Sequence, residues 1–334
     1  MFSNDSRCRK DAAMIRYVVK RLLILIPTLL VVAIIMFTLM DFVPGDPAVI
    51  ALGNGNHTKE EIELKREAMG LNRPYITRLG EYLGNLVFHF DFGTSIVDGT
   101  QIKAVIMSRF PHTLKIAIGS ILLTIVVGLP LGIRTAVRAN TWEDKISLFI
   151  TLLLDCMPSF WVGLLLVLLF SLKLGWFPSS GVGGLKYFVL PVIANSLGGL
   201  AGFTRQTRAS MLEVIRSDLV TTARSKGISE REVIYGHALP NALIPIITIV
   251  GMRFGQMLGG ATIIEVIFSI PGLGPYLVNG IGSQDYTVVT GGIIFIAFSF
   301  AIIMLLTDLV YAFVDPRIKA QYVARNRKRG GKDE

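Results

Sequence analysis

Long apolar runs constrain this chain more than any other feature of its sequence. A helix crosses roughly 30 Å of hydrocarbon with about 20 apolar residues, and only helices and closed barrels satisfy their backbone groups in lipid. The runs lie near residues 22–42, 113–133, 147–171, 187–204, 241–268 and 288–314. With 52% hydrophobic and 17% charged residues, the chain is predicted to be an all-α polytopic membrane protein with about six transmembrane helices.

Lysine and arginine gather in the connections on one side of these runs. Short basic connections resist translocation and stay in the cytoplasm. The basic segments are the N-terminal tail (1–21), the connection between the second and third runs, the segment 205–240 and the C-terminal tail (315–334). We therefore expect both termini in the cytoplasm. The net charge of +9 indicates topology and attraction to lipid headgroups, and no nucleic-acid partner, because no basic patch is interleaved with exposed aromatic residues.

The one long connection covers residues 43–111 and is predicted to be an extracytoplasmic loop with short helices. Thr58 and Glu61 have the spacing of a capping box, and Gly70 stands where a helix end favours a left-handed residue. A second amphipathic run begins at Tyr75. Two interpretations are open: a small helical cap packed on the bundle, or a docking surface for an external soluble protein.

The segment 205–240 is a charged insert between two apolar runs. Apolar residues recur every fourth position from Met211 through Ile215 and Leu219 to Ala223, which predicts one helix face lying on the bundle. Gly227 should end this helix, and Ser229 and Glu232 have capping-box spacing for a second short helix. Pro240 should stop the second helix just before the next span.

These features divide the chain into five parts. They are the cytoplasmic tail 1–21, the first transmembrane helix 22–42, the loop 43–111, a five-helix core 112–314 that includes the insert 205–240, and the basic cytoplasmic tail 315–334.

The insert resembles the EAA loop of binding-protein-dependent ABC importer permeases, written E-A-A, three residues, G, nine residues, I-x-L-P. The matching residues are Ala223, Gly227, Leu239 and Pro240, whereas Thr221, Thr222 and His237 replace the pattern's Glu, first Ala and Ile. Further segments resemble the dipeptide, oligopeptide and nickel branch of that family: Pro44-Gly45-Asp46-Pro47, Asp91-Phe92-Gly93-Thr94-Ser95, Glu265 with Phe268 and Pro271-Gly272-Leu273-Gly274, and Asp315-Pro316-Arg317.

The resemblance implies a permease subunit of an ATP-driven importer in a bacterial or archaeal inner membrane. Its implied partners are a second homologous permease, two ATP-binding subunits and an extracytoplasmic substrate-binding protein. ATP and Mg would belong to the partners, and the chain has no G-x-x-x-x-G-K-S/T loop. The expected ATPase-coupling residues are Thr221, Thr222, Ala223, Gly227, Ser229, Glu230, Arg231, Glu232, His237, Leu239 and Pro240. Peptide is the favoured cargo, with nickel, metal chelates and glutathione as alternatives.

Ionisable residues inside the apolar runs are costly unless they are paired or wetted. They are Asp155, Arg253, Glu265 and Asp308. Arg253 and Glu265 are expected about 18 Å apart on one helix, too far to pair. Structural pairing and a role in the translocation path are both open, and an ion-coupled secondary transporter using these groups is the alternative from another class. Its inverted repeats are not evident in the sequence.

Two further expectations concern packing and metals. Gly251, Gly255 and Gly259 repeat at four-residue spacing, which favours close helix packing. Cysteine and histidine are too scattered for a metal site, and the sequence has no H-E-x-x-H or G-x-S-x-G motif. We therefore expect no enzyme activity of the chain itself.

Overall fold

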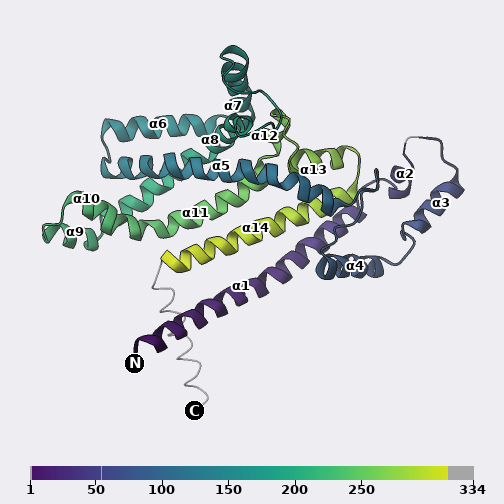
Figure 1. The fold of residues 1–334 in the computed structure, drawn as a ribbon, viewed down its shortest axis with the longest axis horizontal. Helices are drawn as coiled ribbons and strands as arrows, with labels where there is room; N and C mark the ends of the chain where they lie inside the picture. Colours follow the sequence, from purple (N-terminus) through teal and green to yellow (C-terminus); the bar gives the residue numbers. More distant parts are fainter. Residues whose placement is uncertain (1, 54, 315–334) are drawn as a thin grey trace.

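The computed structural model describes residues 2–53 and 55–314, and its described part is a bundle of long helices (Figure 1). Five helical segments are long and apolar enough to cross a membrane. They are Leu22–Asp41 within α1 (Phe2–Asp41), α5 (Ile102–Val137), α8 (Lys186–Ile215), Glu230–Gly259, whose main part is α11 (Leu239–Gly260), and Tyr286–Val310 within α14 (Tyr286–Val314). The predicted polytopic α-helical class is confirmed.

The third apolar run is a broken span. It consists of α6 (Trp142–Cys156) and α7 (Ser159–Leu166), which continues into the π-helical η2 (Val167–Lys173), and the two arms are bent by 96°. Met157 before Pro158 has an extended backbone, with φ −84° and ψ 122°. The proline ring disfavours the helical conformation of the residue before it, which accounts for the break. Counted as one span, this pair brings the number of spans to six.

The long helices run side by side, with short helices at both ends of the bundle (Figure 1). α5 packs along α8, and α11 packs on α14, which also contacts α1. One end carries α9 (Asp218–Ser225) and α10 (Glu230–Glu232), near the start of α1 and the end of α14. Residues 205–215 belong to α8, so from here on the insert means residues 217–240 only.

The opposite end carries the short helices of the long connection, and we call it the cap end (Figure 1). Its elements are α2 (Pro47–Leu52), α3 (Lys59–Ala68), α4 (Tyr75–Gly84), the π-helical η1 (Asn85–His89) and α13 (Leu273–Gly282). The predicted capping box forms, because Glu61 N–H donates to Thr58 Oγ1 at 3.3 Å and Thr58 N–H donates to Glu61 Oε2 at 2.9 Å. α5 begins at Ile102, ten residues before the predicted start of the core at 112.

Candidate functional site

The first helix of the insert has a different register from the predicted one. α8 ends at Ile215, and the extended Ser217 precedes α9. Arg216 and Ser217 interrupt the helix, so apolar residues four positions apart on either side of them do not share one face. Val220 and Ala223 are buried, whereas Leu219 is 43% exposed. The predicted apolar face through Leu219 is therefore wrong, while Met211 and Ala223 are buried as expected.

The turn of the insert lies at Gly227, where α9 has ended. Gly227 has φ +75°, and its N–H donates to the carbonyl of Arg224 at 3.0 Å. Glycine adopts this left-handed conformation without the steric cost that a Cβ imposes. No atom lies within 4 Å of the position that a Cβ would occupy. The backbone conformation therefore requires glycine here, and crowding does not.

The second helix begins at Ser229, whose Oγ accepts the N–H of Glu232 at 3.4 Å. This is one of the two hydrogen bonds of the predicted capping box. The other, from the Ser229 N–H to the Glu232 side chain, is not present in the described residues. α10 then continues through the π-helical η3 (Val233–Ala238) into α11 without a stop. The prediction that Pro240 ends this helix is wrong. Pro240 is the second residue of α11, directly after the π-helical η3, and the helix continues past it.

An ion pair that the sequence analysis did not identify closes the insert. Arg224 Nε donates to Glu230 Oε2 at 3.0 Å, and Arg224 Nη2 lies 2.5 Å from Glu230 Oε1. Both side chains are exposed, and the pair joins α9 to α10 across Gly227. The two residues are six positions apart, which is not a helical spacing, so only a turn at Gly227 brings them together.

The inner face of the insert belongs to one apolar core with three long helices, and we call this core the insert cluster. Val220, Ala223, Val233, Ile234 and Ala238 supply the insert's share. The long helices contribute Ile133 and Ala136 of α5, Phe203 and Met211 of α8, and Ala242 and Ile246 of α11. Protein interiors are close-packed and transmit displacement. A push on the insert therefore reaches α5, α8 and α11 together.

The outer face of the insert is polar and unobstructed. Thr221, Thr222, Arg231 and Glu232 are exposed, as is Tyr235 on η3. His237 is half-buried, and its carbonyl accepts the side-chain amide of Asn241 at 2.8 Å. Leu239 is partly buried against the insert cluster. The insert thus presents a polar surface on an apolar base.

The charged residues of the spans lie in separate places. Asp155 of α6 pairs with Arg205 of α8 at 2.7 Å, and Asp308 of α14 is partly buried with an interaction partner. Arg253 of α11 lies beside Gly202 of α8. The expectation that Arg253 and Glu265 share one helix is wrong, because α11 ends at Gly260 and Glu265 lies on the short helix α12 (Thr262–Ile267).

Glu265 of α12 contacts the start of α13. It is 0% exposed, and its Oε2 accepts the N–H of Gly274 at 2.8 Å in the first turn of that helix. A carboxylate is favourable at a helix N-terminus. Gly272 passes so close to the Glu265 carboxyl group that any side chain there would overlap it. The Pro271-Gly272-Leu273-Gly274 motif and Glu265 thus form one structural unit.

The glycines of α11 differ in their surroundings. A Cβ at Gly251 would overlap Thr307 of α14, and a Cβ at Gly255 would overlap Phe300 of α14. These two glycines let α11 approach α14 closely. Gly259 has no atom within 4 Å of its Cβ position.

Two motifs of the long connection meet the start of α14 at the cap end. Asp285, 2% exposed, accepts from Ser95 Oγ at 2.5 Å and from the N–H of Val288 at 3.2 Å. The Tyr286 hydroxyl donates to the carbonyl of Pro44 at 3.1 Å. The segments 44–47 and 91–95 are therefore both tied to α14. Neither Asp285 nor Tyr286 stood out in the sequence, because their partners are far away along the chain.

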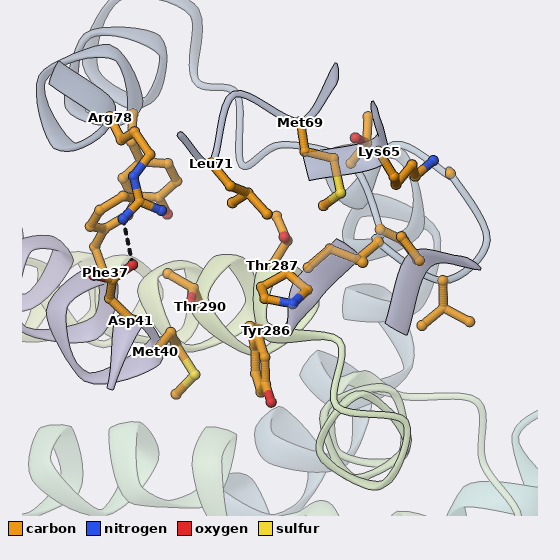
Figure 2. Close-up of a pocket in the computed structure, with 18 of the residues that line it drawn as sticks. Phe37, Met40, Asp41, Lys65, Met69, Leu71, Arg78, Tyr286, Thr287 and Thr290 are labelled. Atoms are coloured by element: carbon orange, nitrogen blue, oxygen red, sulfur yellow. Dashed lines mark hydrogen bonds and ion pairs between the residues drawn. The ribbon is translucent and has the colours of Figure 1, made fainter. Parts of the chain in front are cut away.

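A cavity of about 650 Å³ opens among these elements (Figure 2). Arg78 and Asp41 lie on one side of it, with Arg78 Nη2 2.6 Å from Asp41 Oδ1, and Lys65 lies on the other side. Nearby, Asp46 accepts from Arg66 at 2.7 Å and caps α2. Burial alone would raise the pKa of Asp46, but Arg66 and the Ala48 N–H lower it below its usual value. In the described residues no group of three His, Cys, Asp or Glu could hold a metal.

Known relatives share almost the whole chain. It is 40% identical over 310 residues to a peptide transport system permease protein of Brucella abortus (strain 2308), covering 90% of this chain and 98% of that protein. It is 38% identical over 306 residues to the glutathione transport system permease protein GsiC of Escherichia coli (strain K12), covering 92% of this chain and 99% of GsiC.

Solved structures share the fold. A structure of the MetNI methionine ABC transporter in an inward-facing conformation matches with a TM-score of 0.52 and 18% identity, over 64% of this chain and 97% of that one. Another crystal form gives a TM-score of 0.55 and 17% identity, over 63% of this chain and 96% of that one.

Two family descriptions cover most of the sequence. Residues 14–117 match the N-terminal part of the binding-protein-dependent transport system membrane component, and residues 128–320 match the binding-protein-dependent transport system inner membrane component. The chain belongs to this family of inner-membrane permease components of ABC importers.

Proposed function

We propose that this permease imports peptides and that its insert is the contact through which cytoplasmic ATP-binding subunits drive it. The observation that carries the coupling role is the two-sided construction of the insert. Its outer residues are polar and exposed, while its inner residues share one apolar core with α5, α8 and α11. A partner gripping the outer face would move three long helices as one body.

The same proposal gives the two ends of the bundle their sides of the membrane. The insert lies at the end where α1 starts and α14 finishes (Figure 1), and the basic residues of 205–240 favour the cytoplasm. The cap end with its cavity then faces the external substrate-binding protein. ATP and Mg belong to two ATP-binding subunits, and a second permease completes the translocation pathway.

Peptide cargo is supported by the relatives. The Brucella abortus relative is named for peptide transport, and GsiC is named for transport of glutathione, itself a peptide. Nickel and metal chelates are the less favoured cargo of this proposal, because neither of these relatives is named for metal transport.

A glycine substitution at the turn of the insert tests the coupling role. Gly227→Leu forces a side chain into a left-handed backbone, at a cost of about 1–2 kcal/mol. In the full complex in liposomes we expect normal membrane insertion, peptide uptake below about a tenth of wild type, and loss of cargo-stimulated ATP hydrolysis.

The chain offers a matched control at Gly175, which has φ +65° and no atom within 4 Å of its Cβ position. Gly175→Leu carries the same backbone strain away from the insert and should keep most of the uptake. Gly227→Asn should recover activity, because asparagine tolerates the left-handed conformation. Wild-type uptake by Gly227→Leu would overturn the coupling role, and failure of the wild-type complex to import any peptide would overturn the cargo.

A further inference from the structure

Three arginines on α8 and α11 differ in how their charge is balanced. Arg208 forms a two-pronged pair with Asp144, with both N···O distances at 2.7 Å. Arg205 pairs with Asp155 at 2.7 Å. Arg253 has neither an ion pair nor a hydrogen bond from its side chain to any other described residue. A guanidinium group inside a span is expensive without a partner, so of these three arginines Arg253 is the one whose charge no described residue balances.

Arg253 faces a glycine of α8. A Cβ at Gly202 of α8 would lie 2.5 Å from Arg253 Nη2, so the guanidinium lies directly against the bare backbone of α8. Gly198, one turn earlier on α8, is exposed and has no atom within 4 Å of its Cβ position. These two glycines, four positions apart, put no side chain of their own on the face of α8 that Arg253 meets.

The neighbouring face of α11 includes polar residues. Thr248, Met252 and Gln256 are exposed at helical spacing on one face of α11, and Arg253 is partly buried beside them. Polar residues within spans face the bundle interior or a wetted cavity. Arg253 lies seven residues before the end of α11, about 10 Å along its axis.

We propose that Arg253 binds a carboxylate of the cargo on its way through the membrane. The inference rests on the proposed peptide cargo, because every unmodified peptide carries a terminal carboxylate. Guanidinium binds carboxylate through two parallel hydrogen bonds, a geometry that lysine cannot reproduce. Gly202 and Gly198 place no side chain of their own on this face of α8. The two paired arginines, Arg205 and Arg208, have no such role because their carboxylates are already in place.

The test compares alanyl-alanine with its C-terminal amide. Binding of each radiolabelled compound is measured by equilibrium dialysis on the purified complex without the substrate-binding protein, so that the selectivity of that protein does not enter. We expect wild type to bind alanyl-alanine at least about tenfold more tightly than the amide, as a charge-assisted hydrogen-bonded pair provides. Arg253→Gln should abolish this preference, and Arg253→Lys should retain part of it.

Arg205→Gln is the matched control, because it removes an arginine whose carboxylate lies on the same chain, and it should leave the preference intact. The inference is overturned if wild type shows no preference for the carboxylate or if Arg253→Gln keeps it. If Arg253→Gln instead separates the two permeases during gel filtration and keeps the preference, the missing anion is a carboxylate of the second permease. Peptide uptake by the wild-type complex is measured in parallel, so a failure of the proposed cargo is recognised separately.

Discussion

The two ends of this bundle differ in what is added to their apolar cores. The insert rests on buried apolar side chains, and within the described residues its one ion pair, Arg224–Glu230, is exposed. At the cap end, buried carboxylates supplement an apolar core that includes Phe92 and Leu273: Asp285 accepts from Ser95 and the first turn of α14, and Glu265 accepts from the first turn of α13. Apolar contacts are non-directional, whereas hydrogen bonds require one geometry.

This difference matches the different tasks proposed for the two ends. An insert that passes motion to α5, α8 and α11 needs close packing and a free outer face. A cap that meets an external protein needs its loops held in one conformation, and the Ser95–Asp285 bond holds one of them from a distance of 190 residues along the chain. Removing the apolar packing of the insert, the buried hydrogen bonds of the cap end and the exposed ion pair in turn should therefore lower the stability by different amounts.

The largest effect is expected from the apolar side. Ile234 is 4% exposed within the insert cluster, and Ile234→Ala should lower the free energy of unfolding by about 2–4 kcal/mol through lost burial and a cavity. Thermal unfolding of the purified complex measures this loss. Transport by Ile234→Ala should fall further than its loss of stability alone explains. The control is Tyr235→Ala at the exposed neighbouring residue, which should leave the free energy of unfolding within about 0.5 kcal/mol of wild type.

A smaller effect is expected at the cap end. Asp285→Ala removes the acceptor for Ser95 Oγ and Val288 N–H, at a cost of about 1–3 kcal/mol. Hydrogen exchange should speed up in residues 93–101 and at the start of α14, with the insert unchanged. Asp285→Asn retains one acceptor oxygen and should lose less. Faster exchange in the insert would show that the two ends are not held independently.

The smallest effect is expected at the exposed ion pair. Arg224→Gln should cost less than about 1 kcal/mol, because solvent and salt screen such pairs. The double variant Arg224→Glu with Glu230→Arg restores opposite charges and should return the melting temperature to that of wild type. A loss well above 1 kcal/mol would mean that the pair, rather than the insert cluster, holds the insert.

Much of this architecture could be predicted from the sequence, because the relevant signals are local. Apolar runs predicted the spans, and Gly227 predicted the turn of the insert through its own backbone freedom. The register of α9 was missed, although Ser217 followed by Asp218 is a helix-start signal and Ser217 is the N-cap of α9.

The partners of the buried carboxylates could not be predicted. Glu265 looks like a costly charge within an apolar run until the chain folds back and supplies the N–H of Gly274. Asp285 looks like an ordinary loop residue until Ser95 reaches it. Such contacts depend on the tertiary fold, and hydropathy and spacing carry no information about them.

The most direct test of the coupling role is cross-linking to the ATP-binding subunits. Single cysteines are introduced at the exposed residues Thr222 on the insert and Ile76 on α4, in a background with Cys8 and Cys156 replaced by serine, and a short bifunctional thiol-to-amine reagent is added to the assembled complex. The account predicts a product joining Thr222→Cys to an ATP-binding subunit and none from Ile76→Cys. A product from Ile76→Cys alone would contradict it.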